Sequence, residues 1–113
     1  MLIIKIMKVN IKPLSVNACW QGKRFKTPKY KDYEKELINK LKPMDIPDGK
    51  LKVFLVFGLS SKLADIDNPV KAFIDILQKK YNFNDRDIYE MNLKKIDVKK
   101  GKEYIKYDIR PCE

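Results

Sequence analysis

The sequence predicts one small α/β (α+β) domain over residues 1–113, in which a mixed β-sheet packs against two main helices. Two observations carry this prediction. Short apolar runs rich in β-branched and aromatic residues alternate with two segments of helical periodicity. In addition, a chain of 113 residues has about the size of one domain, and its 44% hydrophobic and 35% charged residues are typical of a folded protein.

The N-terminal part predicts a strand, a loop and a helix in that order. Residues 1–11, MLIIKIMKVNI, alternate loosely between apolar and polar side chains without a breaker, which favours a strand. Two prolines and a glycine then make residues 12–29 a loop. Residues 29–42 form a helix that must stop by Pro43. The side chains that this helix buries, at helical spacing, are Tyr30, Tyr33, Leu37 and Leu41.

The middle of the chain predicts a buried strand and a second helix. LKVFLVFGLS, residues 51–60, is a short continuous apolar run, which fits a central strand buried on both faces. Pro69 suits the first position of a helix, with Asn68 as its N-cap, and this helix ends near Lys80. Its apolar face consists of Val70, Phe73, Ile74 and Leu77.

The C-terminal part predicts a β-hairpin. Residues 87–110 alternate between apolar and polar side chains on both sides of the turn Lys-Lys-Gly-Lys at 99–102. Together with the strands at 1–11 and 51–60, the hairpin completes the predicted mixed sheet.

The residue types exclude several kinds of site. The chain has no histidine, so zinc sites built on histidine, histidine general bases and Ser-His or Cys-His pairs are excluded. Cys19 and Cys112 are too few and too far apart for a disulfide scaffold, so free thiols are expected. No apolar run reaches the roughly 18 residues of a membrane span, and the N-terminus has no cleavage signal. We therefore expect a cytoplasmic protein without a membrane partner.

The charge of the chain predicts the class of its partner. A formal net charge of +10, from 25 Lys and Arg against 15 Asp and Glu, concentrates anions around the protein. In the cytoplasm the abundant large anion is nucleic acid, so RNA or DNA is the expected partner. The alternative is that lysine is enriched by an AT-rich genome and spreads over every solvated surface.

Basic and aromatic side chains are interleaved in the loop at 12–29. Lysine and arginine bind phosphates while rings stack on bases, which suits a strand of nucleic acid. The alternative is an ordinary surface loop whose Trp20 and Phe25 fill the core. The predicted DNA-binding residues are Lys12, Asn17, Trp20, Lys23, Arg24, Lys26 and Lys29.

The segment ADIDNPVKAFIDILQKKYNFND gathers carboxylates in an otherwise basic chain. Asp65 and Asp67 flank Ile66, so in an extended connection both carboxylates point the same way. Asp85, or its neighbour Asp87, is a third carboxylate that the tertiary fold has to bring back towards the start of the helix. Clustered carboxylates repel one another unless a cation relieves them, and oxygen ligands without His or Cys suit Mg²⁺ or Mn²⁺.

Metal-assisted phosphodiester hydrolysis is a chemistry that unites a basic surface with a small aspartate site. Bound cations lower the pKa of an attacking water and neutralise the leaving oxygen, which replaces the missing histidine. On this interpretation Lys71 stabilises the charge on the phosphate, and Asp75 holds the Lys71 ammonium in place. The alternative is structural: Asp67 and Asn68 cap a helix whose outer face carries a solvated pair of Lys71 and Asp75.

One motif runs through the second helix and the turn after it, and reads Asp65-x-Asp67-Asn68-x-x-Lys71-x-x-x-Asp75-x-Leu77 followed by Asp85-x-x-Ile88. This motif resembles the core signature of the RusA family of Holliday junction resolvases. Upstream, LSVNACW is similar to the family's early Ser-x-Asn and aromatic segment, and the helix that contains YEKEL is similar to its Lys-rich helix. The resemblance covers most of the chain in matching order.

The resemblance implies a small α/β homodimer that binds four-way DNA junctions and nicks two opposed strands with Mg²⁺, during recombination and repair. It places catalytic roles on Asp65, Asp67, Lys71 and Asp85, with the three aspartates as metal ligands. Supporting positions around these ligands are Asn68, Asp75 and Asn84. Family members commonly have Asp-Asp where this chain has Asn84-Asp85, so position 84 offers only a neutral amide. A compact resolvase of this kind suits a phage or prophage.

Two other functions stay open at the level of sequence. One is a non-catalytic basic module that binds RNA or DNA and uses its aspartates for capping and solubility. The other is a Mg²⁺-dependent nuclease that acts on other branched DNA, on duplex or on RNA. A homodimer is expected on symmetry alone, because a four-way junction is roughly two-fold symmetric and a single domain offers one site.

Overall fold

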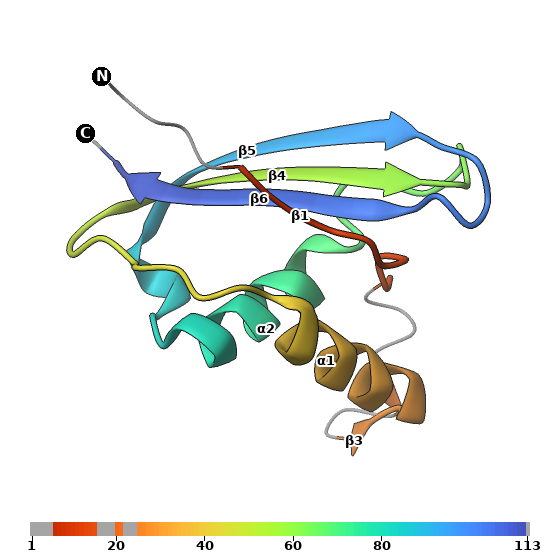
Figure 1. Cartoon of the computed structure of the whole chain (residues 1–113), viewed down its shortest axis with the longest axis horizontal. Coiled ribbons are helices and arrows are strands. Elements are labelled where there is room, and N and C mark those ends of the chain that lie inside the picture. The colour runs from red at the N-terminus through yellow and green to blue at the C-terminus, as the bar shows by residue number, and fades with distance from the viewer. Residues whose placement is uncertain (1–5, 16–19, 22–24, 113) are drawn as a thin grey trace.

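A mixed four-stranded sheet with both helices on one side forms the fold, in a computed structural model that describes residues 6–15, 20–21 and 25–112 (Figure 1). The strands lie in the spatial order β1-β6-β4-β5. Their bounds are β1 (Met7–Val9), β4 (Leu51–Leu59), β5 (Ile88–Asp97) and β6 (Tyr104–Pro111). β4 runs parallel to β5 and antiparallel to β6, which also pairs antiparallel with β1. The prediction of one small α+β domain with a mixed sheet and two helices is therefore confirmed.

The remaining elements are the helices, one short turn and a separate pair of short strands. The helices are α1 (Pro28–Lys40) and α2 (Val70–Tyr81), and a 3₁₀ turn, η2 (Asp85–Asp87), leads from α2 into β5. Two short strands, β2 (Trp20–Gln21) and β3 (Phe25–Lys26), pair antiparallel within the predicted loop. None of the helices in the described ranges is both long and apolar enough to cross a membrane.

α1 lies close to the predicted range 29–42, but it begins one residue earlier, at Pro28, and ends two residues earlier, at Lys40. The side-chain oxygen of Thr27 accepts a hydrogen bond of 3.2 Å from the backbone N–H of Tyr30, which caps the helix, and Pro28 occupies the first position. The helix ends at Lys40, before Pro43. All four predicted core positions are buried, namely Tyr30, Tyr33, Leu37 and Leu41.

α2 has the predicted length but not the predicted cap. Phe73, Ile74 and Leu77 are buried, as expected. Asn68 is not the N-cap, because the turn continues to Pro69, which takes the cap position without a side-chain hydrogen bond. The backbone N–H of Asn68 instead donates to the carbonyl of Asp65 at 3.2 Å. The helix ends at Tyr81, and the C-cap Asn82 adopts the left-handed conformation with φ of 56°.

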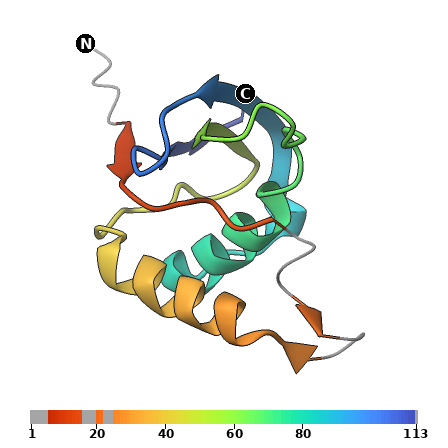
Figure 2. The same cartoon turned by 90° about the vertical axis from the view of Figure 1, so that its right-hand side faces the viewer.

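β4 is central, as predicted, but it is not buried on both faces. Its side chains alternate between buried and partly exposed from Leu51 to Val56, and only its last residues are buried without interruption. The reason is that both helices lie on one side of the sheet (Figure 2). Leu51, Val53, Leu55 and Phe57 face that side. The alternate side chains of β4 face away from the helices.

β5 and β6 do not form the predicted hairpin, because β4 lies between them. The connection at 98–103 passes the end of β4, where the N–H of Val98 donates to the carbonyl of Leu59 at 3.0 Å. Its turn contains Gly101 at φ of 89°, a conformation that glycine adopts without steric cost. Alternation around a turn predicts two strands, but it does not tell whether a third strand separates them.

Candidate active site

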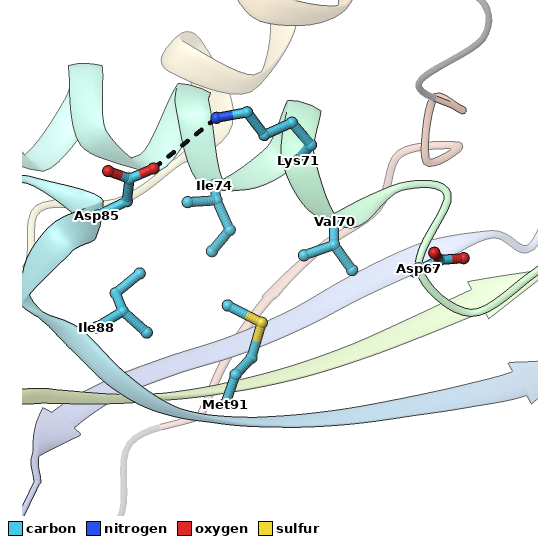
Figure 3. Close-up of a pocket in the computed structure, with 7 residues that line it drawn as sticks. All are labelled: Asp67, Val70, Lys71, Ile74, Asp85, Ile88 and Met91. Carbon is cyan, nitrogen blue, oxygen red and sulfur yellow. Dashed lines mark ion pairs between the residues drawn. The ribbon is translucent and has the colours of Figure 1, made fainter.

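A cavity of about 400 Å³ lies between α2 and β5, on the side of the sheet that carries the helices (Figure 3). Three residues of the predicted motif, Asp67, Lys71 and Asp85, line this cavity. The rest of its wall is apolar and consists of Val70, Ile74, Ile88 and Met91. The fold therefore brings the two separate parts of the motif to one concave surface.

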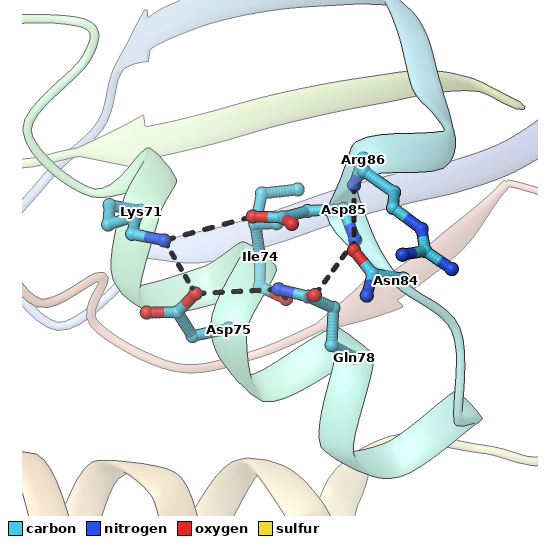
Figure 4. Close-up of polar contacts among 7 residues, drawn as sticks. All are labelled: Lys71, Ile74, Asp75, Gln78, Asn84, Asp85 and Arg86. Atoms are coloured by element: carbon cyan, nitrogen blue, oxygen red, sulfur yellow. Dashed lines mark hydrogen bonds and ion pairs between the residues drawn. The ribbon is translucent and has the colours of Figure 1, made fainter.

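Lys71 is the hub of this site, because its ammonium contacts carboxylates from both parts of the motif (Figure 4). Lys71 Nζ lies 3.0 Å from Asp75 Oδ1 and 3.8 Å from Asp85 Oδ2. The hydrogen bond to Asp75 raises the pKa of Lys71 above its usual value, and the charges of Asp75 and Asp85 add to this effect. Lys71 is therefore a cation at neutral pH, and its side chain is 63% exposed, which leaves it accessible to an anion. The predicted contact between Lys71 and Asp75 is confirmed.

Gln78 fixes the position of Asp85, a role that the sequence did not predict. The side-chain oxygen of Gln78 accepts a hydrogen bond of 2.8 Å from the backbone N–H of Asp85. Its amide nitrogen lies 3.4 Å from Asp75 Oδ1, so Gln78 links the helix carboxylate to the turn that follows (Figure 4). The available signal was helical spacing, since Gln78 stands one turn after Asp75 and two turns after Lys71 on the same face.

Asn84 acts as the cap of η2 in this structure. Its side-chain oxygen accepts a hydrogen bond of 3.0 Å from the backbone N–H of Arg86. Asn84 thus shapes the turn that presents Asp85.

Asp65 and Asp67 do not lie in an extended connection, so the predicted geometry that would give their carboxylates a common direction is wrong. Residues 66–69 form turns, and the N–H of Val70 donates to the carbonyl of Asp67 at 3.1 Å. Asp67 lies at the opposite end of the cavity from Asp85, with apolar side chains between them (Figure 3). Asp65 is exposed and is not among the residues that line the cavity.

The donor atoms of the site fit a hard divalent cation, because they are carboxylate oxygens in a chain without histidine. Their arrangement is more open than a metal centre. Within residues 6–15, 20–21 and 25–112, no group of three acidic or other ligating side chains is close enough to share an ion. In this structure the Lys71 ammonium is the cation that faces Asp85.

The predicted DNA-binding residues are only partly described. Asn17, Lys23 and Arg24 lie outside the described residues, and Trp20 belongs to β2. Lys12 and Lys29 are exposed and line the same hollow beside α1. Lys26 is partly buried: its Nζ lies 3.1 Å from Glu34 Oε2 and 5.1 Å from the centre of the Tyr30 ring. Among the described residues of this set, Lys12 and Lys29 share one hollow, whereas Lys26 pairs with Glu34.

Comparison with known proteins adds no assignment. Neither the profiles of known protein families nor the curated proteins contain a match to this chain. The likeness to RusA resolvases thus rests on the motif residues of the sequence alone.

Proposed function

We propose that this protein is a Mg²⁺-dependent endodeoxyribonuclease that resolves four-way DNA junctions as a homodimer. The observation that carries the proposal is the contact of Lys71 with Asp75 and Asp85 in a cavity that Asp67 also lines. The motif residues come from two segments of the chain, and a role in capping alone does not require that they meet. The excess of 25 basic over 15 acidic residues supports a polyanionic substrate.

The side chains have distinct roles on this proposal. The carboxylates that would hold Mg²⁺ or Mn²⁺ are Asp67 and Asp85, which line the cavity, together with Asp65, which lies outside it in this structure. When bound, the cation supplies an activated water and neutralises the leaving oxygen, for which this chain has no histidine. Lys71 binds a non-bridging oxygen of the scissile phosphate and stabilises the charge that develops on it.

The neighbours of Lys71 keep it in place for this role. Asp75 holds the ammonium through a 3.0 Å hydrogen bond, while the longer 3.8 Å contact to Asp85 is the one that a phosphate displaces most easily. Gln78 holds the backbone N–H of Asp85 and Asn84 holds that of Arg86, which together fix the turn that carries Asp85. A homodimer provides two such sites for the two opposed strands of a junction.

A non-catalytic DNA-binding module is the second candidate, and one observation favours it. The carboxylates at the two ends of the cavity are separated by apolar side chains, and Lys71 already neutralises Asp85. On this alternative the acidic residues serve solubility and pair with lysines, and the basic surface alone binds DNA. The two candidates differ in one respect, which is cleavage in the presence of Mg²⁺.

A substrate panel tests the proposal. The purified chain is incubated with a labelled four-way junction, a linear duplex of the same sequence and a single strand, each with Mg²⁺ or with EDTA. We expect paired nicks in opposed strands of the junction that require Mg²⁺. Junction binding without cleavage in Mg²⁺ or Mn²⁺ would assign the protein to the non-catalytic candidate. Equal cleavage of the duplex would agree with a Mg²⁺-dependent nuclease but would contradict the four-way junction as its specific substrate.

A further inference from the structure

The face of the sheet that points away from the helices carries a second set of basic and aromatic side chains. Figure 1 shows α1 and α2 on one side of the sheet only, and no other described element lies on the opposite side. The registers of the strands align the outward side chains in rows. This open face consists of Lys8 on β1; Tyr104, Lys106, Asp108 and Arg110 on β6; Lys52, Phe54 and Val56 on β4; and Glu90, Asn92, Lys94 and Ile96 on β5.

The charge of the open face is positive, because both of its acidic side chains already have basic partners. Glu90 pairs with Lys52, whose Nζ lies 2.6 Å from Glu90 Oε2. Asp108 is buried and binds Arg110 Nε at 2.5 Å. The cations that remain on this face are Lys8, Lys94 and Lys106. The open face is therefore complementary to an anion.

An aromatic ring lies flat on this face because of a glycine. A Cβ atom built at Gly58 would lie 2.6 Å from Cε1 of Tyr104, a distance that real side chains do not adopt. The absence of a side chain at Gly58 thus lets the Tyr104 ring cover the backbone of β4. Lys8 Nζ lies 4.8 Å and Lys106 Nζ 5.6 Å from the centre of this ring. The ring is partly buried, and the flexible lysines lie over it, so a ligand base would take the place of an ammonium group on the ring.

A hollow of about 260 Å³ lies on the same face, and Lys106, whose Nζ lies over the Tyr104 ring, is part of its lining. The central strand contributes Phe54 and Val56 to it, and the flanking strands contribute Lys94, Lys106 and Arg110. The Arg110 guanidinium lies 4.6 Å from the centre of the Phe54 ring. An apolar centre between rows of cations matches the chemistry of a single strand, which has bases for the centre and phosphates for the rows.

We propose that this open face binds a segment of single-stranded DNA, with bases on Tyr104 and Phe54 and phosphates on Lys8, Lys94 and Lys106. A second copy of the chain is a poorer occupant, since two equal faces with excess lysine repel each other. Duplex DNA is also poorer, because its bases are stacked internally and do not reach the rings. The choice of DNA over RNA rests on the proposed function, because branched DNA exposes single strands next to the point of cleavage; the chemistry of the face does not depend on it.

Anisotropy of a labelled oligo-dT of about 15 nucleotides, measured in EDTA, tests this proposal. The variant Lys94→Ala/Lys106→Ala removes two cations from the open face. Its matched control is Lys99→Ala/Lys100→Ala, which removes two exposed cations from the turn between β5 and β6. We expect the first variant to weaken binding by at least about tenfold and the control by less than about threefold.

A third variant separates stacking from charge. Tyr104→Leu keeps an apolar side chain but removes the ring, and we expect about fivefold weaker binding with an unchanged salt dependence. Equal weakening by both lysine pairs, or tighter binding of a duplex of the same length, would overturn the proposal. If light scattering detects a dimer, and only the Lys94→Ala/Lys106→Ala variant changes it, the open face binds a second copy of the chain instead. Equal affinity for oligo-U would overturn the choice of DNA.

The proposed function and this inference fail in different experiments. If the open face binds a single strand but the protein does not cleave a junction in Mg²⁺, the proposed nuclease function is contradicted and the proposed binding face still stands. If the protein cleaves a junction in Mg²⁺ but none of the three variants changes strand binding, the proposed binding face is contradicted and the proposed nuclease function still stands.

Discussion

The two faces of the central sheet share one backbone but differ in how deeply their side chains are buried and in whether helices cover them. On the helix side, β4 buries Val53, Leu55 and Phe57, and the cavity with Lys71 lies at the margin of this packed layer. On the open side, the same strand presents Lys52 and Phe54, which are only partly buried. A strand alternates its side chains between the two faces, so a one-residue step separates a core position from a surface position. One strand thus supports a rigid site on one side and an accessible surface on the other.

This difference predicts how stability and binding respond to change. The helix side is packed against α1 and α2, so substitutions there act mainly on the free energy of unfolding. The open side has no described layer upon it, so substitutions there act mainly on what the protein binds. The following predictions sharpen or break this contrast.

The largest expected difference in stability is between two phenylalanines on β4. Phe57 is fully buried and its ring packs edge-on against Phe73 at 6.1 Å, so Phe57→Ala should destabilise the fold by about 3–5 kcal/mol. Phe54 faces the open side, and Phe54→Ala should cost only about 1 kcal/mol, mainly from lost contacts with Lys52 and Arg110. Urea unfolding measures both values. Equal costs would show that another layer covers the open face.

A smaller effect is expected at the close approach of Gly58 and Tyr104. Gly58→Ala should cost about 1–2 kcal/mol, because its Cβ displaces the Tyr104 ring from the sheet. In a Tyr104→Ala background the same substitution should cost nothing or stabilise the fold, because the space is free and alanine is less flexible than glycine when unfolded. A double-mutant cycle by urea unfolding measures this coupling. Additive effects of the two substitutions would contradict the flat placement of the ring.

The smallest effect concerns the ion pairs that join the two helices on the packed side. Glu34 Oε2 on α1 lies 2.9 Å from Lys79 Nζ on α2 and 3.1 Å from Lys26 Nζ. Burial acts to raise the pKa of Glu34, but the hydrogen bonds from Lys79 and Lys26 outweigh it and hold the pKa below its usual value. Since the folded state binds the proton less tightly, this contribution is complete above the unfolded pKa near 4.5 and is lost as the pH falls through the lower folded pKa.

Thermal unfolding of Glu34→Gln between pH 6 and pH 3 measures that contribution. The variant should be less stable than the parent by under about 1 kcal/mol at pH 6, and the difference should vanish towards pH 3. Glu36→Gln is the matched control, because Glu36 pairs with Lys40 on the exposed side of the same helix. A difference that grows as the pH falls would contradict the proposed role of Glu34.

Sequence patterns predicted the individual helices and strands better than they predicted which of these elements lie next to each other. The helical spacing of Tyr30, Tyr33 and Leu37 identified a buried face, because apolar residues at that period have few other uses. The hairpin was wrong because pairing of β5 and β6 depends on where β4 inserts, which no local pattern encodes. The prediction of Asn68 as the N-cap was wrong, because the turn before α2 continues as far as Pro69, which takes the cap position instead.

The site was predictable in part for the same reason. Lys71 and Asp75 stand one turn apart on a helix, so their contact follows from spacing alone. The contact of Lys71 with Asp85 depends on a turn held by Gln78, a residue whose type gives no such signal. The open face of β4 was missed because its outward residues include Phe54 and Val56, which make the strand read as continuously apolar.

The most direct test of the central contrast is Asp67→Asn, which changes one charge at the cavity and nothing on the open face. Single-turnover cleavage of a four-way junction in Mg²⁺ and anisotropy of the same junction and of oligo-dT are measured on the variant and on Asp45→Asn, an exposed control. We predict that cleavage by Asp67→Asn falls by at least about a hundredfold, because one carboxylate of the cation site is gone. Junction binding should persist or tighten, oligo-dT binding should stay the same, and stability should change by at most about 1 kcal/mol. A folded Asp67→Asn protein that binds the junction and still cleaves it at the parent rate would contradict the account.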